Sequence, residues 1–98
     1  MLNITHAYLV ALISSYHTSE EDARRFMSAS NELDWVSQID CGCIVHAWLH
    51  DCWEDDLRRF GISEGSIANI HKVLDAGFRS VHFDCSAPVV EGLERWNW

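Results

Sequence analysis

Five side chains that can bind a metal ion or act as nucleophiles lie close together near the middle of the chain. They are Cys41, Cys43, His46, His50 and Cys52. Cysteine thiolates and histidine nitrogens are the ligands that zinc prefers, and four of them in a tetrahedral arrangement make a structural zinc site. A thiolate beside an imidazole can also act as a catalytic nucleophile. A small metal-binding protein or a thiol-dependent enzyme is therefore one interpretation of this segment.

The expected local structure argues against convergence of these side chains. Residues 41–49 have the composition of a β-strand, in which successive side chains point to opposite faces. Cys41 and Cys43 would then share an apolar face, and His46 would lie on the other. His46 and His50 would align only in a helix, and the spacing lacks the two-residue ligand pairs typical of zinc sites. We therefore expect no metal and no cofactor, with the thiols packed as small hydrophobic side chains.

The fourth cysteine, Cys85, raises two further possibilities. It follows His82 by three positions, but side chains three apart in an extended segment point to opposite faces, so a catalytic thiol–imidazole pair is not expected. Four cysteines could also form two disulfides. Because the N-terminus lacks the pattern of a signal peptide, we expect a cytoplasmic protein with reduced cysteines. No phosphate-binding loop or nucleophile motif occurs either, so no enzymatic activity is predicted.

The residue pattern predicts a single α+β domain over residues 1–98, with a three- to four-stranded sheet packed by two to three helices in two layers. The apolar run at 6–15 is expected to be a central strand covered on both faces. Segments 33–39 and 41–49 are expected to form a hairpin or a bent strand pair. Segment 79–84 is expected to be the last strand.

Three helices are expected from their capping residues. An N-cap side chain accepts a hydrogen bond from a free N–H of the first turn, and a glycine ends many helices in the left-handed conformation. Ser19 is the expected N-cap of the first helix. Asp51 should cap a short helix that ends at Gly61, and Ser63 should cap a longer one that ends at Gly77.

The chain is strongly acidic, with 15 Asp and Glu residues against 7 Lys and Arg and a formal charge of −8. Four arginines follow an acid by four residues, and we expect the helical pairs Glu20–Arg24, Glu21–Arg25, Glu54–Arg58 and Asp55–Arg59. The remaining acids repel phosphates and anionic membranes and favour a basic protein partner. No direct nucleic-acid or membrane binding is expected. A homodimer whose charge serves only solubility is the alternative.

The chain has five tryptophans, a residue type enriched at the centres of protein interfaces. Trp35, Trp48 and Trp53 are expected in the core. The C-terminal tail, residues 85–98, is expected to lie irregularly over the domain, with Trp96 and Trp98 either fastening it or contacting a partner. The predicted partner-binding residues are Asp51, Glu54, Asp55, Asp56, Trp96 and Trp98.

The C-terminal stretch "DAGFRSVHFDCSAPVVEGLERWNW" resembles the end of a small, functionally uncharacterised domain family of phages, plasmids and prophage islands. The positions that carry the resemblance are Gly77, Phe83, Asp84, Pro88, Val89, Val90, Gly92, Leu93 and Trp98. In "SSYHTSEEDA", His17 stands where this family has an early histidine. The match is weaker in "CGCIVHAW", where Cys43 replaces the aromatic residue that usually follows the glycine. The resemblance spans most of residues 13–98.

This resemblance implies a genetic context and carries no catalytic residues to transfer. Relatives of this kind lie in mobile elements near anti-restriction and toxin–antitoxin genes. The implied function is an accessory protein that binds a basic protein or ribonucleoprotein surface of a defence complex, as an anti-CRISPR or anti-restriction inhibitor does. His17 is either part of that function or a structural hydrogen-bonding residue, and the sequence leaves both open.

Overall fold

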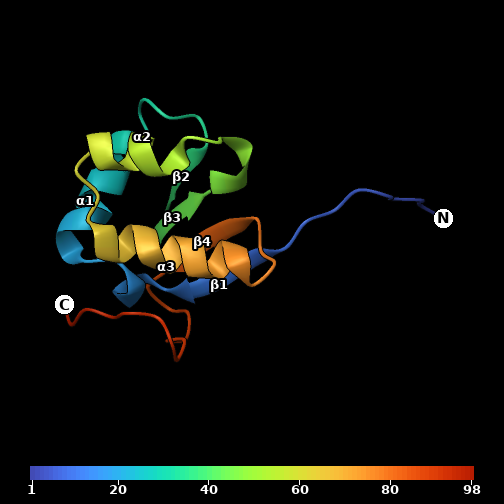
Figure 1. Cartoon of the computed structure of the whole chain (residues 1–98). Helices are drawn as coiled ribbons and strands as arrows, with labels where there is room; N and C mark the ends of the chain where they lie inside the picture. Colours follow the sequence, from blue (N-terminus) through green and yellow to red (C-terminus); the bar gives the residue numbers. More distant parts are fainter.

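Four strands form one mixed sheet in the computed structural model, which describes all of residues 1–98 (Figure 1). Their spatial order is β1-β4-β3-β2, and their bounds are β1 Val10–Ser14, β2 Val36–Ile39, β3 Gly42–Val45 and β4 Ser80–Asp84. β1 pairs with β4 in parallel, whereas β3 runs antiparallel to both of its neighbours. The predicted hairpin and the predicted last strand are therefore confirmed.

Three helices pack against one face of this sheet. They are α1 (Glu20–Ala29), α2 (Trp53–Arg59) and α3 (Glu64–Asp75), and two short 3-10 turns are η1 (Ser15–His17) and η2 (Ala47–Leu49). The inward side chains of strands and helices form one apolar core, in which the Phe26 and Phe83 ring centroids lie 5.9 Å apart. The predicted α+β class is confirmed.

Local capping signals place two of the three helices correctly. Ser19 Oγ accepts a hydrogen bond from the Asp22 N–H at 3.0 Å, and Ser63 Oγ caps α3 in the same way. Asp51 does not cap α2, which was a wrong prediction. The chain makes a tight turn there, in which the Trp53 N–H donates to the His50 carbonyl, so α2 begins after Cys52 without a side-chain cap.

β1 is an edge strand, and the prediction of a central strand covered on both faces is wrong. Ala11 and Ile13 are buried, but Val10 is 41% exposed and Leu12 is 52% exposed on the opposite face. β4 enters the sheet between β1 and β3, and the helices cover only one face. Residues 1–9 belong to no strand, and the N-terminal end of the chain extends away from the domain, while Tyr8 and Leu9 still contact it (Figure 1). An apolar run alone does not distinguish these two kinds of strand.

Two of the three tryptophans expected in the core are buried there, namely Trp35 and Trp53. Trp48 is 40% exposed, so its prediction was wrong. β3 ends at Val45, so Trp48 lies in the short turn η2 beyond the strand and not in the sheet. The Trp48 ring lies 5.3 Å from the Tyr8 ring and 5.2 Å from the guanidinium carbon of Arg79.

Candidate functional site

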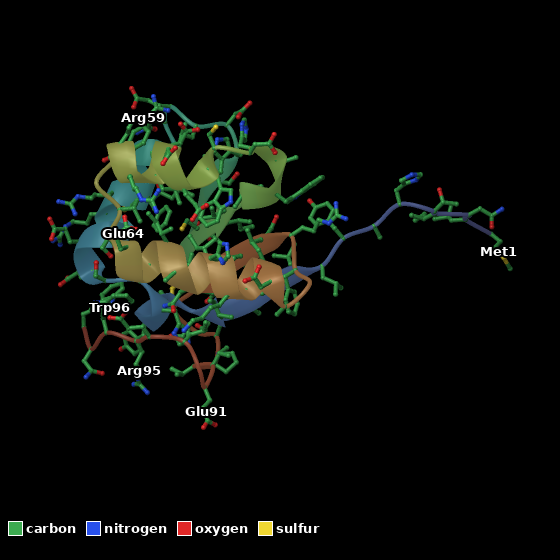
Figure 2. All side chains as sticks on the ribbon, in the orientation of Figure 1. Met1, Arg59, Glu64, Glu91, Arg95 and Trp96 are labelled. Carbon is green, nitrogen blue, oxygen red and sulfur yellow. A yellow bond between two sulfur atoms is a disulfide. The ribbon has the colours of Figure 1, made fainter.

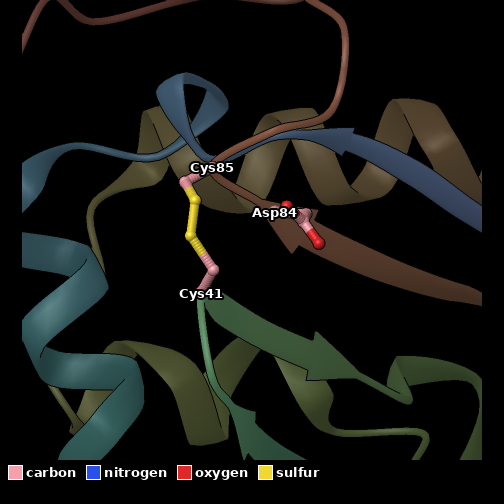
Figure 3. Close-up of side chains that lie close together, drawn as sticks. All are labelled: Cys41, Asp84 and Cys85. Carbon is pink, nitrogen blue, oxygen red and sulfur yellow. A yellow bond between two sulfur atoms is a disulfide. The ribbon is translucent and has the colours of Figure 1, made fainter.

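Cys41 and Cys85 form a disulfide where β3 begins and β4 ends (Figure 3). Cys41 lies in the turn between β2 and β3, and Cys85 directly follows β4. The Cys85 N–H donates to the Cys41 carbonyl at 2.9 Å, so the antiparallel ladder reaches this pair. The prediction of reduced thiols is wrong for these two cysteines, because strand pairing brings together residues that are 44 positions apart.

Gly42 allows the two strands to come this close. A Cβ atom at Gly42 would collide with the backbone carbonyl oxygen of Phe83 on β4. Any other residue would therefore push β3 away from β4 and separate the cysteines that flank this contact. The glycine is a packing requirement of the disulfide corner, which we define as Cys41, Asp84 and Cys85.

Asp84 supplies the third donor group of the disulfide corner. One of its carboxylate oxygens and the two sulfur atoms all lie within 4.8 Å of one another. Asp84 Oδ1 accepts a hydrogen bond from the Ser86 N–H at 2.8 Å, and Oδ2 lies 3.5 Å from His82 Nε2. That nitrogen is buried and has no hydrogen-bond partner. Once reduced, two sulfurs and a carboxylate are donors that zinc accepts.

The five residues of the first metal hypothesis do not converge. Cys43 is buried in the core, where desolvation of the thiolate raises the pKa of its thiol to about 12. His46 Nδ1 is 2.7 Å from Ser80 Oγ, and the His50 ring lies beside Trp35 with 5.1 Å between centroids. Cys52 is an exposed free cysteine.

Sequence reasoning missed Asp84 and Cys85 as partners of Cys41. A usable signal was present, because Cys41 precedes one predicted strand and Cys85 follows another. Antiparallel pairing of those two strands places their opposite ends side by side. The pairing itself could not be chosen from the sequence, which also allowed sheets of other strand orders.

A groove of about 420 Å³ lies beside the disulfide. Its walls are α1, the turn between β2 and β3, and the end of the tail, and they include Phe26, Met27, Cys41 and Trp98. The disulfide corner is therefore next to a space that can admit a small molecule or a peptide side chain.

His17 fastens the tail to the domain and is completely buried. Its Nε2 accepts a hydrogen bond from the Val90 N–H at 2.8 Å. The ring proton must then lie on Nδ1, which donates to the Glu94 carbonyl at 2.8 Å. Both ring nitrogens are hydrogen-bonded to backbone groups of the tail. These contacts support the role of His17 as a structural hydrogen-bonding residue, one of the two roles that the sequence left open.

Asn69 on α3 completes this attachment, and we call His17 and Asn69 together the tail clasp. The Asn69 amide nitrogen donates to the Glu94 carbonyl at 2.8 Å and to the His17 carbonyl at 2.9 Å. Its Oδ1 accepts from the Glu94 N–H at 3.0 Å. Every polar atom of the two side chains has a partner, so no free group remains there for chemistry.

Trp96 and Trp98 also lie against the domain. Trp98 Nε1 donates to the Thr18 carbonyl at 2.9 Å, and its ring meets Tyr16 edge to face with 5.9 Å between centroids. The Trp96 N–H donates to the Tyr16 carbonyl, and its ring lies close against Gly65 on α3. They fasten the tail, one of their two expected roles. Trp98 is still 41% exposed, and its contact with a partner stays a prediction.

Asp22 is a buried acid in the first turn of α1. It is 1% exposed, and its carboxylate accepts hydrogen bonds from the Ser63 N–H, from Ser63 Oγ at 2.5 Å and from Ser66 Oγ at 2.6 Å. These bonds join the beginnings of α1 and α3. The fully paired carboxylate is a structural element.

The predicted acidic surface of α2 consists of Asp51, Glu54, Asp55 and Asp56. Asp51 and Glu54 belong to no ion pair, whereas Asp56 pairs with Arg59 and Asp55 with Arg58. Of the four expected pairs, two form, Glu20–Arg24 and Glu21–Arg25.

The other two expected pairs do not form: Arg59 pairs with Asp56 within α2, and Arg58 turns to an acid of α3, which begins next to α2. Arg58 Nε lies 2.7 Å from Glu64 at the start of α3, and Arg58 also binds Asp55 one turn earlier. The hydrogen bonds from Arg58 hold the pKa of the Glu64 carboxyl below its usual value.

The structure does not bring all predicted partner-binding residues together. Figure 2 shows Arg59, at the end of α2, and Trp96, in the tail, on opposite sides of α3. The tail contacts α3 through Asn69 and through Lys72, whose Nζ donates to the Gly92 carbonyl. The acidic residues and the two tail tryptophans therefore form two separate surfaces.

A sequence profile described as the C-terminal domain of DUF5983, a family of unknown function, matches residues 10–98. The chain belongs to the DUF5983 family. No match was found among curated proteins or among solved structures. The expected resemblance to an uncharacterised family is confirmed at this level.

The region that matches DUF5983 begins at Val10, the first residue of β1, and includes the disulfide corner, the tail clasp and the acidic surface of α2. In this DUF5983 domain no helix is long and apolar enough to cross a bilayer. The family description names no activity.

Proposed function

We propose that this DUF5983 domain is a non-enzymatic binding protein that docks the acidic surface of α2 on a basic protein partner. The observation that carries this proposal is the pair of acids at the start of α2, Asp51 and Glu54, which have no internal cationic partner. Unpaired carboxylates at one edge of a helix attract lysine and arginine side chains and accelerate association with a basic surface.

Exposed apolar side chains lie directly before these acids in the sequence. Trp48 and Leu49 of η2 are both exposed, and they precede Asp51 by only a few residues. Protein interfaces combine an apolar or aromatic centre with a polar rim, and tryptophan is among the residues that contribute most binding energy. η2 and the beginning of α2 supply both components.

The proposed partner is a nucleic-acid-binding groove of a host defence complex, such as a CRISPR ribonucleoprotein or a restriction enzyme. A domain with a formal charge of −8 can compete with phosphates for the same arginines and lysines. The resemblance of the C-terminal motif to proteins of mobile elements points to the same class of target. The proposed mode of action is inhibition by occupancy.

The first experiment captures partners with tagged protein from a bacterial lysate that contains such systems. The test variant carries Asp51→Lys and Glu54→Lys. The matched control carries Asp40→Lys and Glu91→Lys, which make the same charge change at exposed acids that are also in no ion pair. We expect salt-sensitive capture of a basic nuclease or ribonucleoprotein by wild type and by the control, but not by the test variant. Equal capture by both variants would contradict the proposal.

A second experiment distinguishes occupancy from enzymatic inactivation. Nucleic-acid cleavage by the captured complex is titrated with the purified domain. An inhibitor that acts by occupancy reaches full inhibition near one equivalent, and added duplex relieves it. Full inhibition at far below one equivalent would identify a catalytic activity and would overturn the non-enzymatic part of the proposal.

A homodimeric regulatory protein is the second candidate, and the part of the β1 edge that is not hydrogen-bonded to the tail favours it. An edge strand with exposed apolar side chains such as Val10 and Leu12 can pair with a second copy. Sedimentation equilibrium at micromolar concentration separates the two candidates. A dimer that persists in both lysine variants and captures no partner would favour this second function.

A further inference from the structure

We propose that the Cys41–Cys85 disulfide is a reversible link whose reduced form binds one zinc ion, with Asp84 as the third protein ligand. This site is on a different part of the molecule from the acidic surface of α2, so it does not depend on the proposed function. The donor atoms are the two sulfurs and one carboxylate oxygen, which already lie within 4.8 Å of one another (Figure 3).

The backbone holds the two cysteines together without help from the sulfur–sulfur bond. The hydrogen bond from the Cys85 N–H to the Cys41 carbonyl extends a ladder in which Gly42 pairs with Asp84 and Cys43 with Phe83. This ladder belongs to the centre of the sheet, because β4 is also paired with β1 on its other side. Reduction therefore leaves both thiols at the same corner.

Two groups that are not themselves ligands orient the carboxylate of Asp84. The Ser86 N–H binds its Oδ1, and His82 Nε2 faces its Oδ2 at 3.5 Å without any other partner. Groups that hydrogen-bond a ligating carboxylate typically fix its direction and strengthen metal binding. An otherwise unpaired histidine nitrogen next to a carboxylate fits this supporting role.

The site is accessible, and competing thiols are excluded from it. Cys41 and Cys85 are both exposed, so a reductant and a metal ion can reach them. Cys43, the next cysteine along β3, is buried in the apolar core and does not reach the surface corner. Three protein ligands leave a fourth position for water.

The chemistry balances with a dithiol as reductant. Two electrons and two protons pass to the sulfur pair, the sulfur–sulfur bond breaks, and the dithiol becomes a disulfide. The zinc ion then displaces both thiol protons to solvent and forms two zinc–sulfur bonds and one zinc–oxygen bond. In the oxidised state the sulfurs are bonded to each other and cannot bind the ion as thiolates.

The test uses the full chain, prepared once with the disulfide intact and once after treatment with a phosphine reductant without oxygen. Each sample receives zinc, is desalted, and is analysed for metal content. Cobalt replaces zinc in a parallel sample, because thiolate ligands give an absorption band in the near ultraviolet. We expect one metal per reduced chain and at least tenfold less in the oxidised chain.

Three variants locate the ligands. Cys52→Ser removes the exposed free thiol and should leave metal content unchanged. Cys41→Ser should abolish the cobalt–thiolate band at one equivalent. Asp84→Asn keeps the disulfide, folds under the same oxidising conditions as wild type, and should weaken zinc binding at least tenfold after reduction. Circular dichroism of each reduced sample checks that the fold is retained.

Three results would overturn the proposal. The first is a reduced, folded wild type that binds no zinc. The second is metal binding that survives in Cys41→Ser or disappears in Cys52→Ser. The third is a reduced wild type that unfolds, since a reversible link requires a folded reduced state.

Discussion

Two regions of this DUF5983 domain join parts of the chain that are far apart in sequence, and they do so with opposite chemistry. The tail clasp uses His17 and Asn69, which are buried and whose polar atoms are all hydrogen-bonded. The disulfide corner lies at the surface, and the nearby His82 nitrogen has no partner. Both regions close long loops, but only the second retains groups that can react.

This difference between the tail clasp and the disulfide corner distinguishes residues with a structural role from residues that can take part in chemistry. A buried histidine with both nitrogens bonded to backbone contributes to stability and offers nothing to a ligand. Exposed sulfurs beside a carboxylate can exchange partners with solvent species. The residues of the early family-like motif, His17 among them, therefore explain how the tail is held. The groups that can react lie in the disulfide corner, at the same end of the sheet but on its surface.

The largest expected effect comes from breaking the disulfide corner with Cys41→Ser. The disulfide closes a segment with a sequence separation of 44, and the chain-entropy model gives a loss of about 4 kcal/mol in the free energy of unfolding. Urea unfolding measures this change. Cys52→Ser removes an exposed free thiol and should change stability by less than about 0.5 kcal/mol. Equal stability of oxidised wild type and Cys41→Ser would contradict the expected role.

A smaller effect is expected from breaking the tail clasp with His17→Ala, about 2 kcal/mol. In this variant the Val90 N–H and the Glu94 carbonyl lose the His17 ring as a hydrogen-bond partner. Detachment of the tail lets both groups form hydrogen bonds with water instead. Hydrogen exchange should show the Val90 amide opening before the sheet does. His71→Ala is the control, because His71 is an exposed histidine whose only ion pair is with Asp75. Unchanged protection of the Val90 amide in His17→Ala would refute the clasp.

The smallest expected effect concerns the thiol of Cys43, which is buried near the disulfide corner but does not belong to it. Its pKa is raised from 9.0 to about 12 by desolvation, so above pH 9 the unfolded chain loses this proton before the folded chain does. Stability should therefore fall as pH rises from 9 towards 12, by about 1.4 kcal/mol at pH 10. Urea unfolding at pH 8 and pH 10 measures this, and the loss should be absent in Cys43→Ala. The same pH dependence in that variant would assign it to other groups.

Local features of the fold followed from the sequence because each depends on a few neighbouring residues. Ser19 and Ser63 cap helices as predicted, and Gly61 and Gly77 adopt positive φ values of 84° and 103° at helix ends. The prediction failed at Asp51, where a backbone turn from His50 to Trp53 starts the helix only after Cys52. Capping rules consider the side chain at a helix end and do not include such a competing backbone turn.

Non-local features of the candidate site could not be predicted in the same way. The sequence placed Cys41 and Cys85 beside two strands, but the order β1-β4-β3-β2 decided that those strands are neighbours. The same order made β1 an edge strand, against the prediction. Likewise, the position of α3 next to α2 gave Arg58 a different acid, Glu64, as its partner. Each of these outcomes depends on which elements pack together, which local spacing does not encode.

The sequence by itself determined the α+β class, the acidic character and most helix boundaries of this protein, since these depend on composition and on contacts within a few residues. Only the tertiary structure decided that His17 holds the tail and that Cys41, Asp84 and Cys85 meet at one corner. The physical reason is that hydrogen bonds and sulfur contacts act over a few ångströms in space. Residues at such distances are selected by strand pairing and helix packing, whatever their separation along the chain.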